Sequence, residues 1–92
     1  MTRVGRSVRV SGRVQGLYFR GWTVEQACEL GVVGWVRNCP DGSVEAQLSG
    51  DEQAVIELIE RMRRGPPGAQ VAQLTAEEVP PEAGGGFEIR RG

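Results

Sequence analysis

Residues 32–49 read VVGWVRNCPDGSVEAQLS, two apolar runs joined by a Pro-Asp-Gly segment at 40–42. That segment predicts a turn, because proline fixes φ, aspartate offers a side-chain acceptor and glycine tolerates positive φ. The flanking residues predict strands at 32–38 and 43–49. In the second strand, apolar residues alternate with polar ones and should face the core: Val44, Ala46 and Leu48. We therefore expect a β-hairpin here.

Helical patterns lie on both sides of this hairpin. Before it, residues 19–30 place apolar side chains on one arc of a helix, and Gly31 stands where a glycine commonly ends a helix. After it, residues 51–64 predict a second helix, which the Gly-Pro-Pro segment at 65–67 stops. Its apolar residues follow the i, i+3, i+4, i+7 spacing of one helix face: Val55, Leu58, Ile59 and Met62.

Charged and polar residues of the second helix predict specific local contacts. Ser49 and Glu52 have the spacing of a capping box, in which each side chain caps a backbone N–H at the start of a helix. We also expect two ion pairs at four-residue spacing, which would satisfy the arginines near the end of the helix: Glu57–Arg61 and Glu60–Arg64.

The outer segments complete the secondary structure. Residues 7–14 and 69–79 predict strands, 80–86 a plain loop, and the apolar pair at 87 and 89 a short terminal strand. The order is βαββαβ with a short extra strand. This predicts an α+β fold, the ferredoxin-like α/β plait, with an antiparallel sheet and two helices on one face. The 92 residues suffice for one domain, 1–92.

Topology brings three parts of the chain together. A right-handed crossover makes the strands at 7–14 and 32–38 parallel, and the hairpin places the strand at 43–49 between them. The carboxyl ends of the two parallel strands then lie at the same edge of the sheet, where the first helix also begins. We expect the loop Gln15–Tyr18, the first helical turn with Arg20, and Asn38 to meet at this edge.

The composition excludes several kinds of chemistry. The chain has no histidine and no lysine, and only Cys28 and Cys39 as thiols, which we expect to stay reduced. A Schiff base, a P-loop lysine and a four-cysteine zinc site are therefore excluded. The net charge of −1 argues against nucleic-acid binding, and no apolar run has the length of a membrane span. We expect a cytoplasmic domain without a secretory leader.

The loop before the first helix has the composition of an anion site. Residues 12–20 read GRVQGLYFR, in which glycines bracket a loop that enters a helix. Backbone N–H groups of such a loop and of the helix N-terminus attract anions, and Arg20 adds a bidentate fork. The pattern is neither a Walker A motif nor a dinucleotide fingerprint. Taken alone, this segment and Asn38 are each also compatible with ordinary turns.

Three blocks of the sequence resemble the acylphosphatase family: residues 12–20, 30–38 (LGVVGWVRN) and 41–45 (DGSVE). The resemblance covers roughly residues 7–90. It implies metal-independent hydrolysis of an acyl phosphate to a carboxylate and inorganic phosphate, without a cofactor. It also implies that Arg20 and the loop amides bind phosphate, and that Asn38 orients the attacking water. The amides are those of Gln15, Gly16, Leu17, Tyr18 and Phe19.

This chemistry fits the absence of histidine and lysine. The leaving carboxylate has a pKa near 4, so its departure needs no general acid, and phosphoryl transfer asks mainly for positioning and charge. We expect a monomer that takes a small acyl or carbamoyl phosphate, with no nucleic acid or membrane as partner. The alternative is a non-catalytic ferredoxin-like module, either an effector-binding regulatory domain or an RNA-binding one.

Overall fold

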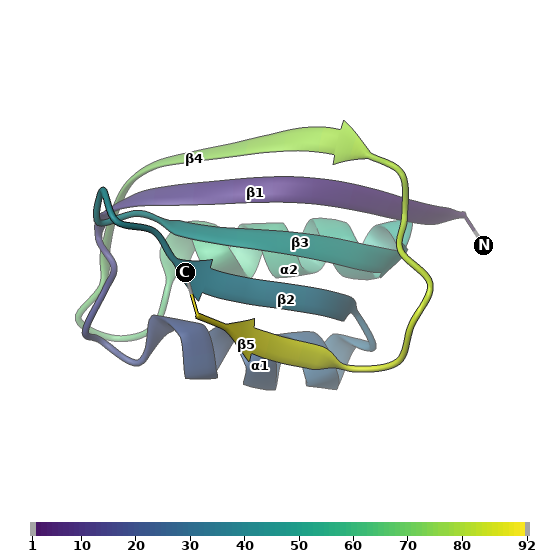
Figure 1. The fold of residues 1–92 in the computed structure, drawn as a ribbon, viewed down its shortest axis with the longest axis horizontal. Coiled ribbons are helices and arrows are strands. Elements are labelled where there is room, and N and C mark those ends of the chain that lie inside the picture. The colour runs from purple at the N-terminus through teal and green to yellow at the C-terminus, as the bar shows by residue number, and fades with distance from the viewer. Residues whose placement is uncertain (1, 92) are drawn as a thin grey trace.

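The computed structural model describes residues 2–91, which form two helices and one five-stranded sheet (Figure 1). The strand order across the sheet is β4-β1-β3-β2-β5. The elements are β1 (Arg3–Arg13), α1 (Phe19–Leu30), β2 (Val33–Asn38), β3 (Val44–Asp51), α2 (Glu52–Arg64), β4 (Gln70–Val79) and β5 (Phe87–Arg90). The predicted βαββαβ plait is confirmed.

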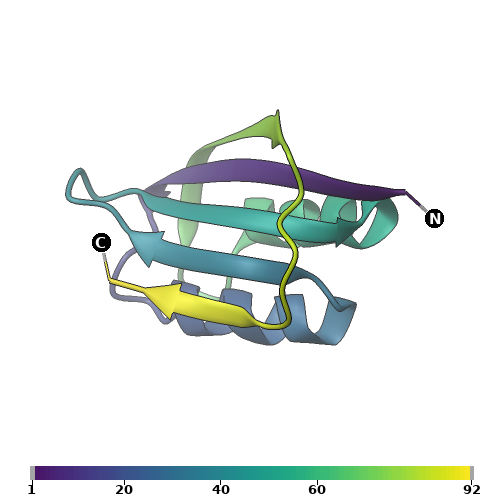
Figure 2. The same ribbon diagram turned by 45° about the vertical axis from the view of Figure 1, so that its right-hand side comes forward.

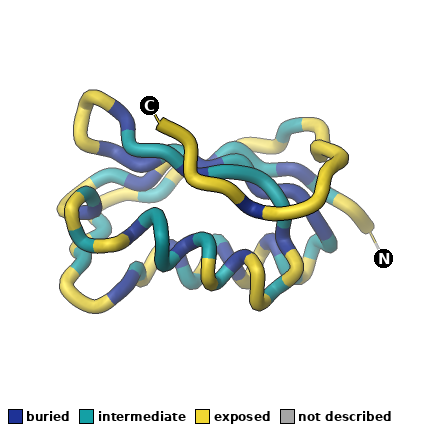
Figure 3. Tube along the Cα trace, turned by 60° about the horizontal axis from the view of Figure 1, so that its bottom comes forward, coloured by how far each residue is buried: buried dark blue, intermediate teal, exposed yellow. Residues whose placement is uncertain are grey.

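Both helices lie on one face of the sheet and leave the other face open (Figure 1). The core between the two layers is built from alternate strand residues and one stripe of α2. Its fully buried side chains include Val8, Val10, Val36, Leu48, Val55, Leu58 and Met62. The hairpin residues predicted to face the core, Val44, Ala46 and Leu48, are all buried completely. The turn at 40–42 and residues 88–91 are exposed (Figure 3).

The central strands pair as the topology predicted. β3 lies between β1 and β2 and is antiparallel to both, so β1 and β2 run parallel to each other. The expectation of an antiparallel sheet holds for β1 to β4, but β5 pairs with β2 in parallel and makes the sheet mixed. Residues 80–86, called the strap below, cross the open face from β4 to the opposite edge (Figure 2). β5 therefore starts at the far end of the sheet and runs in the direction of β2.

The first helix matches its prediction at both ends, whereas two contacts predicted for the second are wrong. Ser49 is fully buried within β3, and its Oγ accepts a hydrogen bond from Glu82 N at 2.9 Å. It therefore holds the strap instead of capping α2, whose N-cap residue Asp51 makes no side-chain cap. The pair Glu57–Arg61 forms at 3.0 Å, but Glu60 bonds Arg63 at 3.3 Å instead of Arg64.

Candidate active site

One end of the molecule collects the ends of four elements. The loop after β1, the start of α1 and the ends of β2 and β5 lie at the left-hand end of Figure 1. This follows from topology, because β1, β2 and β5 all run toward that end and α1 begins there. The edge predicted to carry the site is therefore the edge at which these elements meet.

The loop between β1 and α1 is sharply bent and fixed at both ends. Val14 and Phe19 are buried at 1% and 2% exposure, and they anchor the loop to the core. Between them, Gly16 has φ of 76° and Tyr18 has φ of 61°. Left-handed residues thus stand on both sides of Leu17. Such alternation is the backbone geometry in which successive N–H groups form an anion-binding concavity.

The N-terminus of α1 has no side-chain cap. Its N-cap residue is Tyr18, whose side chain does not accept a hydrogen bond from the helix, and its first turn holds no acidic residue. The first N–H groups of an α-helix have no partner within the helix and carry partial positive charge. This end is therefore open to an anionic ligand, in contrast to α2, whose first turn contains Glu52.

Asn38 ends β2, where it pairs with Val44 of β3, and it is half-buried. The turn that follows is held by Asp41, which accepts hydrogen bonds from Ser43 N at 2.9 Å and Ser43 Oγ at 2.6 Å. These bonds, with the charge of Arg9 at 3.6 Å, hold the pKa of Asp41 below its usual value. The turn is thus a locally bonded unit that fixes the end of β2.

Two adjoining hollows, together called the site hollow below, open at this edge. Arg20, Asn38 and Ile89 line both of them. One hollow is completed by Cys39, Pro40 and Arg91, and the other by Val14, Gly16, Tyr18, Phe19 and Gly21. The structure therefore brings together the loop, Arg20 and Asn38, as the sequence predicted.

Arg20 differs from the other half-buried arginines. Arg6, Arg37 and Arg61 each lie within 4.0 Å of a carboxylate, at 3.9, 2.7 and 3.0 Å. Within residues 2–91, no carboxylate lies within that distance of Arg20, although it too is half-buried. A partly desolvated guanidinium that faces a hollow without a counter-ion is suited to bind an anion.

Gln15 joins the loop to the turn that follows Asn38. Its Nε2 donates to the backbone carbonyls of Cys39 and Ser43, both at 2.8 Å. The sequence marked Gln15 only for its backbone amide, because the partners of its side chain lie in the turn between β2 and β3, far away in the sequence. The side chain thus sets the distance between the two halves of the site.

Ile89 and Arg91 are site-lining residues that sequence reasoning missed. The sequence predicted a strand at 87 and 89 but gave it no neighbour in the sheet. Pairing of β5 with β2 brings Ile89 opposite Val36, two residues before Asn38. The apolar residues Phe87 and Ile89 predicted the strand, but they did not indicate which strand it pairs with.

Both cysteines are free thiols, Cys28 exposed on α1 and Cys39 buried beside Asn38. Within residues 2–91, no three side chains from His, Cys, Asp and Glu gather as metal ligands. The polar side chains that line the site hollow include the guanidinium groups of Arg20 and Arg91 and the amide of Asn38, which suit the binding of an anion such as a phosphate group.

A family model described as Acylphosphatase matches residues 6–89. The chain belongs to the acylphosphatase family. It is 51% identical over 85 residues to a curated acylphosphatase of Rhizorhabdus wittichii, covering 92% of this chain and 86% of the relative. It is also 51% identical over 86 residues to one of Rhizobium meliloti, covering 92% and 90%.

A solved structure of an acylphosphatase from Coxiella burnetii has a TM-score of 0.92 to this chain. The two are 36% identical, and the match covers 96% of this chain and 93% of the other. The chain is therefore an enzyme of the acylphosphatase class, which hydrolyses acyl phosphates, and the predicted family and activity are confirmed. Neither helix of residues 2–91 is long and apolar enough to cross a membrane.

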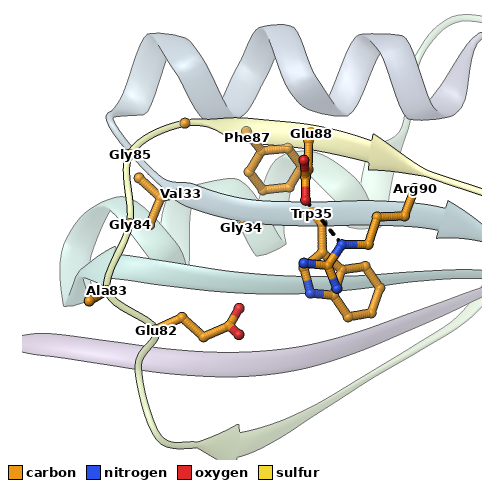
Figure 4. A pocket seen from close by; sticks show the side chains of 11 residues that line it. Val33, Gly34, Trp35, Glu82, Ala83, Gly84, Gly85, Phe87, Glu88 and Arg90 are labelled. Carbon is orange, nitrogen blue, oxygen red and sulfur yellow. Dashed lines mark hydrogen bonds and ion pairs between the residues drawn. The ribbon is translucent and has the colours of Figure 1, made fainter.

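A separate hollow of about 360 Å³ lies between the strap, the first half of β2 and β5 (Figure 4). Trp35 and Phe87 are its aromatic lining residues. The Arg90 guanidinium carbon lies 4.8 Å from the Trp35 ring centroid, and Arg90 Nε bonds Glu88 at 3.1 Å. The ring face and the arginine charge are thus both engaged within the protein. This arrangement does not favour RNA recognition, which relies on exposed aromatic faces for stacking.

Proposed function

We propose that the phosphate of the acyl phosphate binds Arg20 and the loop amides, and that Asn38 orients the attacking water. The amides are those of Gln15, Gly16, Leu17, Tyr18 and Phe19. The observation that carries this proposal is the half-buried Arg20, unpaired within residues 2–91, lining the same hollow as Asn38. The left-handed backbone at Gly16 and Tyr18 and the uncapped start of α1 support the role of the amides.

The proposed reaction needs positioning and positive charge. The water oxygen bonds to phosphorus, the bond between phosphorus and the acyl oxygen breaks, and its electron pair leaves on a carboxylate. A carboxylate with a pKa near 4 leaves without protonation. A phosphate oxygen of the substrate accepts the proton of the water. Arg20 and the N–H groups stabilise charge in the loose transition state. No step requires a metal, a histidine or a covalent intermediate.

The proposed setting is that of a single acylphosphatase domain. Residues 1–92 act as one domain, and the protein works as a cytoplasmic monomer on a small acyl or carbamoyl phosphate, with no cofactor. The regulatory and RNA-binding alternatives gain no support, because Arg20 and Asn38 line the same hollow and the ring of Trp35 on the open face is covered by Arg90.

The decisive experiment compares variants at Arg20 and Asn38. Arg20→Ala should lose both turnover and inhibition by inorganic phosphate, and Arg20→Lys should restore little, because an ammonium cannot form the bidentate fork. Asn38→Ala should lower kcat by roughly 10²–10³ with little change in the phosphate inhibition constant. Arg64→Ala, an exposed arginine at the end of α2, serves as the control.

Thermal melting should show that all four variants are folded. Hydrolysis by the unmodified protein should persist in excess EDTA. An Asn38→Ala protein that turns over normally, or that loses phosphate binding as severely as Arg20→Ala, would contradict this division of roles. Loss of activity with EDTA, restored by a divalent ion, would contradict the metal-free reaction.

A further inference from the structure

Tyr18 has a backbone conformation that a residue with a side chain disfavours. It stands at the start of α1, and its φ of 61° and ψ of 21° lie in the left-handed region. Among residues 2–91 it is the one residue other than glycine with positive φ. Such a conformation costs free energy, and it persists where surrounding contacts support it. The structure therefore needs a contact of Tyr18 that offsets this cost.

The side chain of Tyr18 makes that contact along the surface of α1. Its hydroxyl donates to Glu25 Oε2, seven residues further along the chain, at 2.8 Å. This bond raises the pKa of the phenol above its ordinary value, so the hydroxyl remains a donor at neutral pH. The ring lies against Gly21, where any Cβ would overlap ring carbons. We call the contacts of Tyr18 with Gly21 and Glu25 the clasp.

The clasp and the left-handed backbone of Tyr18 go together. The direction of a Cα–Cβ bond is fixed by the backbone of its residue, so the position of the ring on α1 belongs to this conformation. The main chain is tied to the helix as well, because the carbonyl of Tyr18 accepts a hydrogen bond from Trp22 N at 2.9 Å. Ring, hydroxyl and carbonyl thus hold Tyr18 to α1 at the point where the loop enters the helix.

We infer that the side chain of Tyr18 is a positioning group for phosphate binding, because the clasp keeps the loop before α1 in the turn that forms the anion-binding concavity. This inference rests on the proposed function, which places phosphate at the loop amides and Arg20. The concavity needs left-handed residues at positions 16 and 18. Gly16 adopts that conformation freely, whereas Tyr18 does so with the support of its own side chain.

One test measures the inhibition constant of inorganic phosphate in the Tyr18→Ala and Tyr18→Gly proteins. Inorganic phosphate has no acyl group, so a contact between the ring and an acyl group cannot alter this constant. Tyr18→Ala should raise it about three- to tenfold, because alanine keeps the backbone cost without the clasp and fewer molecules hold the competent loop. Tyr18→Gly should raise it less, because glycine adopts positive φ readily. A constant in Tyr18→Gly that equals or exceeds that in Tyr18→Ala would overturn the inference.

A second test displaces the ring while Tyr18 stays in place. Gly21→Ala puts a Cβ where the ring lies, and alanine is a better helix former than glycine, so this variant should fold. It should raise the phosphate inhibition constant about three- to tenfold in the otherwise unmodified protein, but not in the Tyr18→Gly protein, which has no ring to displace. Gly85→Ala on the strap, where a Cβ meets nothing within 4 Å, is the control. An equal effect of Gly21→Ala in both proteins would assign the effect to the new Cβ and overturn the clasp.

Arg20→Ala separates this inference from the proposed function. If Arg20→Ala remains fully inhibited by phosphate, the phosphate site lies elsewhere and both proposals fail. If Arg20→Ala loses inhibition while the Tyr18 and Gly21 variants keep the constant of the unmodified protein, the proposed function stands and the clasp is overturned. Thermal melting should show that every variant is folded at the assay temperature, so that a changed constant reports on the site.

Discussion

The Nε2 atom of Gln15 lies 2.8 Å from the backbone carbonyl oxygen of Cys39, the residue that follows Asn38. The same atom donates to the carbonyl of Ser43 at 2.8 Å, and that carbonyl also accepts from Cys39 N at 2.8 Å. One side chain of the loop between β1 and α1 thus bonds to both sides of the turn that follows Asn38. The loop and the turn are held at a fixed separation by this amide.

Replacing Gln15 by leucine should therefore reduce turnover. Without the amide, the two carbonyls lose a donor and the loop can shift relative to Asn38. We expect kcat to fall roughly tenfold or more, because small displacements of positioned groups are costly in catalysis. Stability should fall by about 1 kcal/mol, as for a lost hydrogen bond. Steady-state kinetics and urea unfolding measure the two effects, with Gln53→Leu on the exposed side of α2 as control. A Gln15→Leu protein with the kcat of the unmodified protein would show that the hydrogen bonds of Gln15 are not needed to position the loop relative to Asn38.

Inorganic phosphate and sulfate should inhibit competitively. The loop amides, the start of α1 and Arg20 are proposed to recognise a tetrahedral anion whatever group is attached to it. The apparent KM for an acyl phosphate should rise with phosphate concentration while kcat stays constant. Initial rates should be measured at constant ionic strength with chloride as the control anion. Rates unaffected by saturating phosphate would place the substrate elsewhere.

Asp41 should make stability depend on pH in the acidic range. Hydrogen bonds from Ser43 lower its pKa in the folded protein. A carboxyl whose folded pKa lies below its unfolded value of about 3.9 stabilises the protein above that pH, and this contribution is lost as pH falls through the folded pKa. Asp41→Asn should therefore destabilise the protein at pH 7 and much less at pH 3. Urea unfolding at the two pH values measures this, with Glu77→Gln on β4 as control. If Asp41→Asn lowered the free energy of unfolding equally at pH 7 and pH 3, the ionisation of Asp41 would not be the source of its contribution to stability.

Gly34→Ala should be strongly destabilising. Gly34 has φ of 143° in β2, and a Cβ there would overlap the backbone carbonyl of Gln47 on β3. Because backbone on the neighbouring strand cannot move aside, we expect a loss of about 2 kcal/mol or more in the free energy of unfolding. Gly85→Ala on the strap, where a Cβ meets nothing within 4 Å, is the matched control. Equal melting temperatures for the two variants would show that a Cβ at position 34 does not clash with the backbone of β3.

The sequence alone was sufficient to predict features that depend on neighbouring residues. The helix at 19–30 follows from its apolar spacing and Gly31, and the hairpin follows from the Pro-Asp-Gly turn. The meeting of the loop, Arg20 and Asn38 at one edge required only the order of elements and the right-handed crossover. The three sequence blocks also led to the family, because their motifs are local and their separation is fixed by the fold.

Tertiary structure decided what depends on partners distant in sequence. Ser49 has the spacing of a capping residue, yet burial in β3 turns its hydroxyl to the strap. The amide of Gln15 and the side chain of Ile89 enter the site only because other strands lie beside them. Periodicity and turn chemistry act through contiguous residues, so a single segment reveals them. Pairing between strands and the direction of a long loop depend on the packing of the whole sheet, which no single segment encodes.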